Sequence, residues 1–307
     1  MPPAAGNGTP GRHWGPRADP GWRSKQLSTR TSPWRYGFSA YVMPPEHFRT
    51  KALDLWNRGF RALEVFAVGD AVTPEVFGRY TEAIGGVRDE TGFAISVHLP
   101  TTDCNPLARN RRVARGAVDS QRAGLEWAGS LGAKLAVLHL GSATARPAQP
   151  AGPSGPEYFG RSWEQARAVL RELAEAADVA GVTLTVENLI GPSELATRPA
   201  HMLELLDHPD LEGVGLTVDL SHAQLSGWDP AEFLRIVAPR LRHVHANDTD
   251  GQGDRHWPLG RGQLALGPVM AELRRLGFAG TLLLEVDAPP EELDHNRGLC
   301  EALAAEA

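Results

Sequence analysis

Cysteine is scarce in this sequence, and long hydrophobic runs are missing from it. Its two cysteines are Cys104 and Cys300, and neither lies in a CxxC pair, so a disulfide framework is excluded. No apolar run reaches the roughly 18 residues that a membrane-spanning helix needs. The first residues also lack the apolar stretch of a signal peptide. We therefore expect a cytoplasmic protein that has no membrane partner.

An excess of positive charge is lacking as well. Lys and Arg number 31 against 37 Asp and Glu, which gives a formal net charge of −6. A chain with this balance has no global attraction to nucleic acid, so a nucleic-acid partner is not expected, although net charge does not exclude a local basic groove. Hydrophobic residues make up 42% of the 307 residues, which is enough for a large core.

The sequence divides into two regions at about residue 33. Residues 1–33 are rich in Pro, Gly and Arg without sustained periodicity, which predicts a disordered N-terminal extension. From Tyr36 onward, short aliphatic runs alternate with amphipathic stretches, and the pattern recurs eight times within residues 34–307. The strands that we expect are 36–42, 62–66, 94–98, 135–139, 183–187, 214–219, 242–246 and 281–285.

This alternation predicts a single (β/α)8 TIM barrel over residues 34–307. Apolar strands separated by helices form parallel sheets covered by helices, and eight units suit a closed barrel better than an open doubly wound sheet. No GxGxxG follows the first expected strand, which disfavours the dinucleotide-binding alternative. The connection at 141–160 is dense in Pro, Gly and Ala, so it is either a substrate-binding lid or an ordinary surface insertion.

Ionisable residues stand at or just after the ends of six consecutive expected strands. Each alone has a simple explanation, such as a hydrogen-bonded rim histidine or a carboxylate that caps the next helix. In a barrel, however, all carboxyl ends meet in one mouth, where crowded carboxylates and imidazoles need a cation to neutralise them. The residues are His98, His139, Glu187, Asp219, His222, His245 and Glu285, followed by Asp254 and His256 in GDRHWPLGRG.

The ligand types narrow the choice of metal. Imidazole and carboxylate without thiolate favour Zn, Mn, Co or Fe over Ca or Mg. The number of histidines favours Zn, whereas a site of two Glu, one Asp and one His suits Mn or Mg as well.

At these residues the chain resembles the xylose isomerase-like TIM-barrel superfamily, whose members include sugar and sugar-phosphate isomerases or epimerases, inosose dehydratase and endonuclease IV. The resemblance covers nearly the whole chain after residue 35. It implies a four-ligand site of Glu187, Asp219, His245 and Glu285. In the epimerases the two glutamates also exchange protons with the substrate carbon, and a histidine at the position of His222 contacts substrate oxygen.

The resemblance to endonuclease IV implies a larger set that holds three zinc ions. Its additional ligands match His98, His139, His222, Asp254 and His256. That set would hold one ion with His98, His139 and Glu187, a second with the four-ligand site, and a third with His222, Asp254 and His256. Two segments depart from the repair enzyme, since YGFSAYVMPPEHF and DLSHAQLSGWD replace its characteristic first- and sixth-strand segments. DTDGQGDRHWPLGRGQL is closer to sugar phosphate isomerase/epimerase relatives.

Two enzymatic hypotheses follow, and a non-catalytic binding barrel is the weakest alternative. The first is a metal-dependent isomerase or epimerase of a sugar, sugar phosphate or related polyol, with Glu187 and Glu285 as proton carriers. The second is a multinuclear zinc hydrolase of a small phosphoester or abasic-site DNA. Arg255, Trp257 and Asn188 are candidate substrate-binding residues, and Asn188 alternatively orients its neighbour Glu187 or forms a turn. A homo-oligomer is compatible with either hypothesis.

Overall fold

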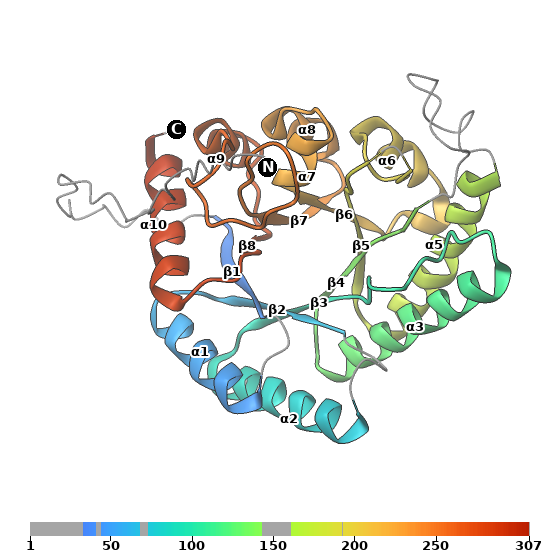
Figure 1. Ribbon diagram of the computed structural model, residues 1–307, viewed down its shortest axis with the longest axis horizontal. Coiled ribbons are helices and arrows are strands. Elements are labelled where there is room, and N and C mark those ends of the chain that lie inside the picture. The colour runs from blue at the N-terminus through green and yellow to red at the C-terminus, as the bar shows by residue number, and fades with distance from the viewer. Residues whose placement is uncertain (1–32, 41–43, 68–72, 143–160, 192, 307) are drawn as a thin grey trace, which may run out of the picture. The chain divides into compact units, whose positions relative to one another are not determined.

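A computed structural model describes residues 33–40, 44–67, 73–142, 161–191 and 193–306. Nearly all of the expected N-terminal extension and most of the expected loop at 141–160 lie outside these residues. Within them, eight parallel strands pair in sequence order, and the first pairs with the last, so the sheet closes. Helices surround this barrel (Figure 1). The expected (β/α)8 fold is confirmed.

The strands lie where the aliphatic runs predicted them, with ends that shift by one or two residues. The first expected strand, 36–42, ends earlier at Ala40, and residues 41–43 are outside the described part of the chain. The strands are β1 Arg35–Ala40, β2 Ala62–Phe66, β3 Ala94–His98, β4 Leu135–Leu138, β5 Thr183–Glu187, β6 Gly215–Asp219, β7 Leu241–Ala246 and β8 Thr281–Leu284.

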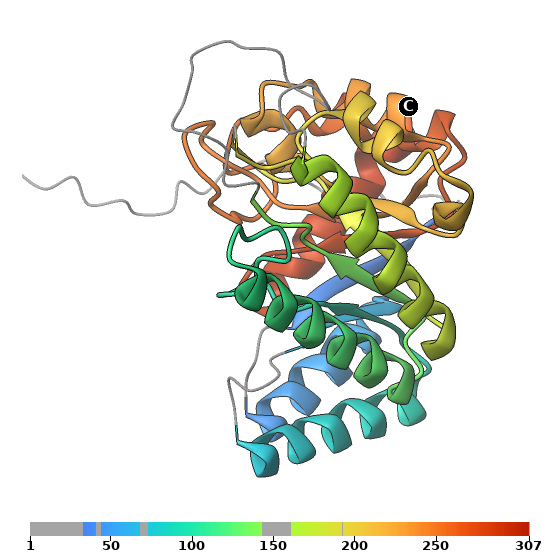
Figure 2. The same cartoon turned by 90° about the vertical axis from the view of Figure 1, so that its right-hand side faces the viewer.

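Helices follow the strands and cover the outside of the barrel. Several begin at a side chain that accepts a backbone N–H of the first turn, as Thr73, Asn110 and Asp229 do. Helices α3 and α5 lie side by side (Figure 2). The helices are α1 Pro45–Asn57, α2 Pro74–Thr91, α3 Arg111–Ser130, α5 Arg161–Ala180, α6 Pro199–Leu205, the 3-10 helix η2 Pro209–Leu211, α7 Leu220–Leu225, α8 Pro230–Val237, α9 Leu266–Arg275 and α10 Pro290–Glu306.

The core between barrel and helices is apolar and rich in aromatic contacts. Phe38 of β1 is 1% exposed, and its ring meets Phe60 and Phe93 edge-on with centroids 6.0 and 5.9 Å apart. These two rings shortly precede β2 and β3, so Phe38 ties the first three strands together.

The lumen of the barrel, by contrast, carries polar side chains in two layers. Side chains two residues apart point to the same side of a strand, so several ligand candidates at strand ends have a buried polar residue below them. Glu64 of β2 is fully buried and hydrogen-bonded to Ser96 of this lower layer. The pairs are Ser96 and His98 on β3, Thr185 and Glu187 on β5, Thr217 and Asp219 on β6, and His243 and His245 on β7.

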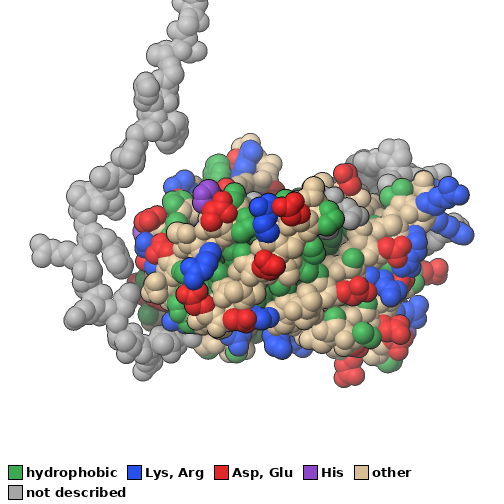
Figure 3. Space-filling model, turned by 90° about the horizontal axis from the view of Figure 1, so that it is seen from below, with side chains coloured by type: hydrophobic (Ala, Val, Ile, Leu, Met, Phe, Trp, Pro, Cys, Tyr) green, Lys and Arg blue, Asp and Glu red, His purple; other side chains and the backbone are tan. Residues whose placement is uncertain are grey.

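The outer surface shows charges of both signs. Acidic and basic side chains are interspersed over the face drawn in Figure 3. Among the described residues, no helix is both long and apolar enough to cross a membrane.

Replacing Phe38 with Ala should destabilise the fold by about 3–5 kcal/mol, because it leaves a cavity that three strands enclose. Urea unfolding of the variant measures this loss. Val179→Ala is the matched control, since Val179 is 88% exposed and its truncation should change the free energy of unfolding by less than about 0.5 kcal/mol. Equal stability of the two variants would contradict the packing described for Phe38.

Candidate metal centre

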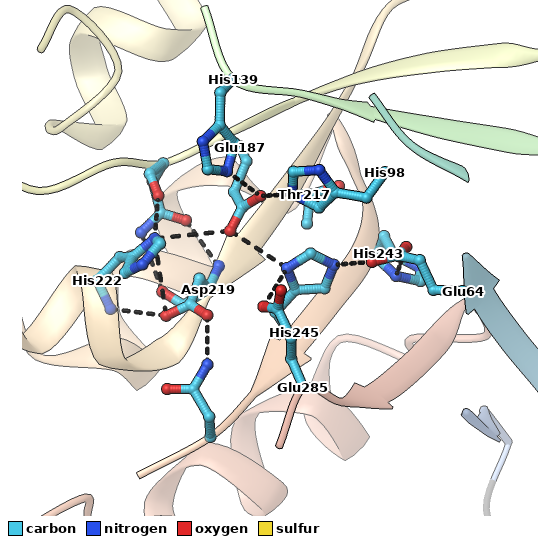
Figure 4. A network of polar contacts seen from close by, with 12 residues as sticks. Glu64, His98, His139, Glu187, Thr217, Asp219, His222, His243, His245 and Glu285 are labelled. Atoms are coloured by element: carbon cyan, nitrogen blue, oxygen red, sulfur yellow. Dashed lines mark hydrogen bonds and ion pairs between the residues drawn. The ribbon is translucent and has the colours of Figure 1, made fainter. Parts of the chain in front are cut away.

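All nine ligand candidates from the sequence lie at the carboxyl-terminal mouth of the barrel. They form three compact groups, in each of which the ligand atoms lie within 4.8 Å of one another. Glu187 belongs to two of the groups and therefore joins them (Figure 4). The groups are His98, His139 and Glu187; Glu187, Asp219, His245 and Glu285; and His222, Asp254 and His256.

The first group converges on one oxygen of Glu187. Nε2 of His98 lies 3.3 Å and Nε2 of His139 lies 2.9 Å from Oε2 of that glutamate. His98 and Glu187 are buried, whereas the side chain of His139 is 26% exposed. The group is therefore open to solvent on the side of His139.

The second group is the most deeply buried. Nδ1 of His245 lies 3.2 Å from Oε1 of Glu187 and 2.9 Å from Oε2 of Glu285. One oxygen of Asp219 accepts the backbone N–H of His222 at 2.7 Å, and the other accepts the Asn247 amide at 2.6 Å. Three carboxylates thus surround one imidazole beneath the mouth.

The third group lies at the rim. Oδ2 of Asp254 lies 3.3 Å from Nε2 of His222 and 3.2 Å from Nε2 of His256. The backbone of His256 has φ of 46°, in the left-handed region that residues other than glycine seldom adopt. This conformation directs the imidazole of His256 to the mouth, and such outliers gather at functional sites.

Backbone carbonyls fix the tautomer of three of the histidines. Because a carbonyl only accepts, the Nδ1 that faces it must carry the proton. Nδ1–H of His98 donates to the carbonyl of Leu99 at 3.0 Å. Nδ1–H of His222 donates to the carbonyl of Asn188 at 2.8 Å, and Nδ1–H of His256 donates to that of Glu285 at 2.9 Å. In the neutral form of each of these rings, Nε2 is therefore left with a lone pair that faces the carboxylates.

Charges within the centre shift several pKa values. Burial by itself would raise the pKa of Glu187, but His245 and His139 outweigh it and hold that pKa well below its ordinary value. Burial raises the pKa of Asp219 to about 6, a rise that the Glu187 charge reinforces and that His222 opposes. Burial disfavours protonated His245, yet Glu285 and Glu187 raise its pKa well above the ordinary value.

The donors at this mouth fit a divalent cation. Oε2 of Glu285 is buried and receives no well-aligned hydrogen bond from the described residues, although it lies close to His245. A buried carboxylate oxygen without a hydrogen bond costs free energy that a cation would recover. Imidazole and carboxylate together suit Zn, Mn or Co.

A single carboxylate organises the loop that carries Asp254 and His256. Asp248 is fully buried, and its oxygens accept the backbone N–H groups of Thr249, Gly260, Gly262 and Leu264 at 2.9 to 3.0 Å. Gly262 is required there, because a Cβ would lie 2.2 Å from the Thr249 carbonyl oxygen. Asp248 therefore holds the loop in place.

The candidate substrate-binding residues differ in their surroundings. The side chain of Arg255 is 45% exposed and its Nε lies 3.1 Å from Asp250, within the same loop. Trp257 pairs through its backbone with Asp248. The buried Asn188 side chain donates to the carbonyl of Asp219 and accepts its N–H, at 2.9 and 2.7 Å, which favours an orienting role over substrate contact.

Sequence reasoning missed three buried residues that contact the ligand candidates. Glu64 lies 3.0 Å from His245 and 3.2 Å from His243, and Asn247 binds Asp219. Burial would raise the pKa of Glu64, but these two imidazoles lower it far below its ordinary value. Two sequence features could have revealed Glu64 and His243: a single acidic residue inside the apolar run ALEVF, and two histidines at positions i and i+2 in HVHAND, whose side chains point to the same side of a strand.

A cavity of about 320 Å³ opens beside His139. Glu194 borders it, and one of its carboxylate oxygens is buried without a hydrogen-bond partner among the described residues. The other oxygen contacts the hydroxyl of Ser142. The lining residues are Thr101, Asp103, Cys104, Asn105, His139, Gly141, Ser142, Leu189 and Glu194.

Comparison with known families identifies one match that covers most of the chain. The family model of the xylose isomerase-like TIM barrel matches residues 55–303. An uncharacterised protein of Methanocaldococcus jannaschii is 27% identical over 255 residues, which cover 82% of this chain and 83% of that protein. Fructoselysine 3-epimerase of Escherichia coli O157:H7 is 28% identical over 129 residues, which cover 40% of this chain and 46% of that enzyme.

Solved structures resemble the barrel over nearly its whole length. A D-tagatose 3-epimerase-like protein superposes with a TM-score of 0.70 at 23% identity, covering 89% of this chain and 98% of its own. A protein from Thermus thermophilus, whose crystal was soaked with ZnCl2, superposes with a TM-score of 0.66 at 26% identity, covering 90% and 99%.

The pKa values of the third group predict how the stability of metal-free protein depends on pH. Burial disfavours protonation, yet Asp219 and Asp254 raise the pKa of His222 to about 10, and Asp254 and Glu285 raise that of His256 to about 9. Unfolded histidine titrates near 6.5, so the folded state binds more protons above that pH and loses stability as pH rises towards 10. Thermal melts with a chelator present measure this decline.

Asp254→Asn is the variant that isolates this effect. It removes a carboxylate that helps to keep both imidazoles protonated, so its melting temperature should fall less steeply than that of the wild type between about pH 7 and 10. Parallel curves for the two proteins would show that the third group does not govern the pH dependence.

Proposed function

The chain belongs to the xylose isomerase-like TIM-barrel family, and on that premise we propose that it is a metal-dependent isomerase or epimerase of a sugar, a sugar phosphate or a related polyol. The observation that carries the proposal is the buried group of Glu187, Asp219, His245 and Glu285. Glu187 at the end of β5 and Glu285 just after β8 face one imidazole there. The names of sugar-epimerase relatives support the substrate class.

The same group would hold the cation. Nδ1 of His245 and the carboxylates of Glu187, Asp219 and Glu285 offer one nitrogen and three oxygen ligands, a set that suits Zn or Mn. A bound divalent cation would supply Lewis-acid polarisation of a substrate carbonyl, which makes the hydrogen on the neighbouring carbon more acidic.

The two glutamates would move the proton. Glu187 is held as a carboxylate by His245 and His139, so it is in the form that accepts a proton. Oε2 of Glu285 lies 2.9 Å from Nδ1 of His245 without a well-aligned hydrogen bond from the described residues, so this oxygen would carry the proton that is delivered to the substrate. One carboxylate would remove the proton from the substrate carbon, and the other, protonated from solvent, would deliver a proton to the opposite face, which inverts that carbon and leaves the first glutamate protonated.

The remaining residues of the mouth would bind and orient substrate oxygens. His222 is protonated at neutral pH in the metal-free protein, because Asp219 and Asp254 raise its pKa to about 10. The cavity beside His139 offers the hydroxyl and carboxylate groups of Ser142 and Glu194, which suit the hydroxyl groups of a polyol.

Replacing Glu285 with Gln tests the proton-transfer role. The change removes the proton-carrying group at nearly constant volume, so kcat should fall by about 10²- to 10⁴-fold. Reactions with ketoses such as D-tagatose in heavy water, followed by NMR, should show deuterium in the product of the wild type and none in that of the variant.

Glu90→Gln is the matched control for that experiment. Glu90 lies on the surface, where its side chain is 47% exposed and pairs with Arg49. Glu90→Gln removes one negative charge, as Glu285→Gln does, but at a distance from the mouth, so the activity of this variant should equal that of the wild type. A Glu285→Gln variant with full activity would refute the site itself.

A second candidate function is hydrolysis of a phosphoester by several clustered ions. The observation in its favour is that the nine residues form three ligand groups, two of which share Glu187, and this is more than a single-ion epimerase needs. Clustered cations bind the scissile group, activate water and stabilise the leaving oxygen. The substrate would be a small phosphoester or, less in keeping with the net charge of −6, abasic-site DNA.

Metal analysis of the purified protein separates the two functions. One Mn, Mg or Zn ion for each chain is expected for the epimerase, whereas three zinc ions would favour hydrolysis. The companion assays are release of phosphate or alcohol from small phosphoesters and nicking of an abasic-site duplex. Hydrolysis that depends on three zinc ions, without deuterium incorporation from any ketose tested, would overturn the epimerase proposal.

A further inference from the structure

We propose that Glu64 is a positioning residue of the metal centre, which holds His245 in the tautomer whose Nδ1 lone pair faces Glu187 and Glu285. The inference rests on the proposed function, because it concerns the cation that this group would bind. It adds to the metal centre a supporting residue of β2, a strand that contributes none of the nine ligand candidates.

The first support is the placement of Glu64 directly behind His245. Its carboxylate is fully buried in the lower layer of the lumen, and Oε1 lies 3.0 Å from Nε2 of His245 (Figure 4). Oε2 accepts the hydroxyl of Ser96 at 2.9 Å and lies 3.2 Å from Nε2 of His243. The Ser96 hydroxyl thus holds Oε2 by a hydrogen bond, while Oε1 is left for His245.

The second support is that neither atom has another partner. Oε1 of Glu64 and Nε2 of His245 are both buried, and neither is in a well-aligned hydrogen bond with any other described residue. A buried polar atom without a partner is costly. The two atoms are 3.0 Å apart, so a small rotation of the imidazole would align them as hydrogen-bond partners.

The third support comes from three other histidines of the centre. His98, His222 and His256 donate Nδ1–H to backbone carbonyls and direct Nε2 to the mouth. His245 is turned the other way, with Nδ1 towards the carboxylates of the mouth and Nε2 towards the lumen. The carboxylate of Glu64 is placed to accept a ring N–H of His245, as a backbone carbonyl does for each of those three histidines.

The chemical consequence concerns which nitrogen carries the proton. A neutral imidazole has one N–H, and a carboxylate that accepts it at Nε2 leaves the Nδ1 lone pair available to a cation. A carboxylate behind a ligating histidine also makes the imidazole more basic and fixes the angle of the ring. Loss of such a partner typically weakens metal binding by about 10- to 100-fold.

Zinc affinity of Glu64→Leu is the decisive measurement, because leucine has no oxygen that could accept Nε2–H of His245, whereas glutamine would keep one. Zn²⁺ titrations against a chromophoric chelator should show one class of ion bound about 10- to 100-fold more weakly than in the wild type, with the number of ions unchanged. Glu90→Leu makes the same substitution at the surface and should bind Zn²⁺ as the wild type does. Equal affinities of Glu64→Leu and wild type, or a lower number of ions in the variant, would overturn the proposal.

A spectroscopic readout reports the tautomer independently of affinity. In zinc-loaded protein with ¹⁵N-labelled histidine, His245 should show a proton bonded to Nε2 and an Nδ1 shift typical of a ligated nitrogen. A proton on Nδ1 of His245 in the wild type would refute the proposed role of Glu64.

Ser96→Ala serves if Glu64→Leu does not fold, which far-UV circular dichroism decides. It removes only the hydroxyl that holds Oε2, so a smaller weakening of the same ion class is expected, and unchanged affinity would count against the proposal. These experiments distinguish a failure of the proposed role of Glu64 from a failure of the proposed function. A wild type that binds no Zn²⁺ or Mn²⁺ refutes both, whereas normal binding by Glu64→Leu refutes only the role of Glu64.

Discussion

Burial of many ionisable side chains at one mouth is the constraint on which the rest of this structure depends. Eight parallel strands in a closed ring bring their last residues together, and here many of those residues are carboxylates and imidazoles with little exposure. Unpaired charge in such a place costs several kcal/mol for each ion. The pairing of carboxylates with imidazoles reduces this cost, and a divalent cation would reduce it further, which is why we interpret the centre as a metal site.

The backbone itself prepares several of the ligands. Carbonyls just after β3, β5 and β8 accept hydrogen bonds from ring N–H groups, so the direction of three imidazoles is set by the path of the main chain. Asp248 plays a related part for the loop after β7, because four backbone N–H groups of that loop close around its carboxylate. The centre is therefore largely preorganised before any ligand arrives.

The sequence allowed the barrel and the nine residues of the mouth to be predicted, for different reasons. Alternating aliphatic runs and amphipathic helices are local patterns that predict the barrel, and the strand ends of a barrel must meet, so polar residues at those ends were expected to gather. Glu64 and His243 were missed because their roles depend on register between strands far apart in the sequence, namely β2 and β7. Asn188 was a candidate for substrate contact because the sequence does not reveal its neighbour in β6. In the structure, the amide nitrogen and oxygen of its side chain are both hydrogen-bonded to the backbone of Asp219.

The position of Glu187 in two ligand groups has a consequence for how the centre fills. One oxygen faces His98 and His139, and the other faces His245. Two cations that share this carboxylate are thermodynamically linked, since each changes the free energy with which the other binds, and by the same amount in both directions. A first ion would neutralise the Glu187 carboxylate and so weaken its attraction for a second ion. The same ion would also order the Glu187 side chain, which would favour binding of the second ion. Occupancy of the mouth by cations would thus be a collective property, governed by one glutamate at the end of β5.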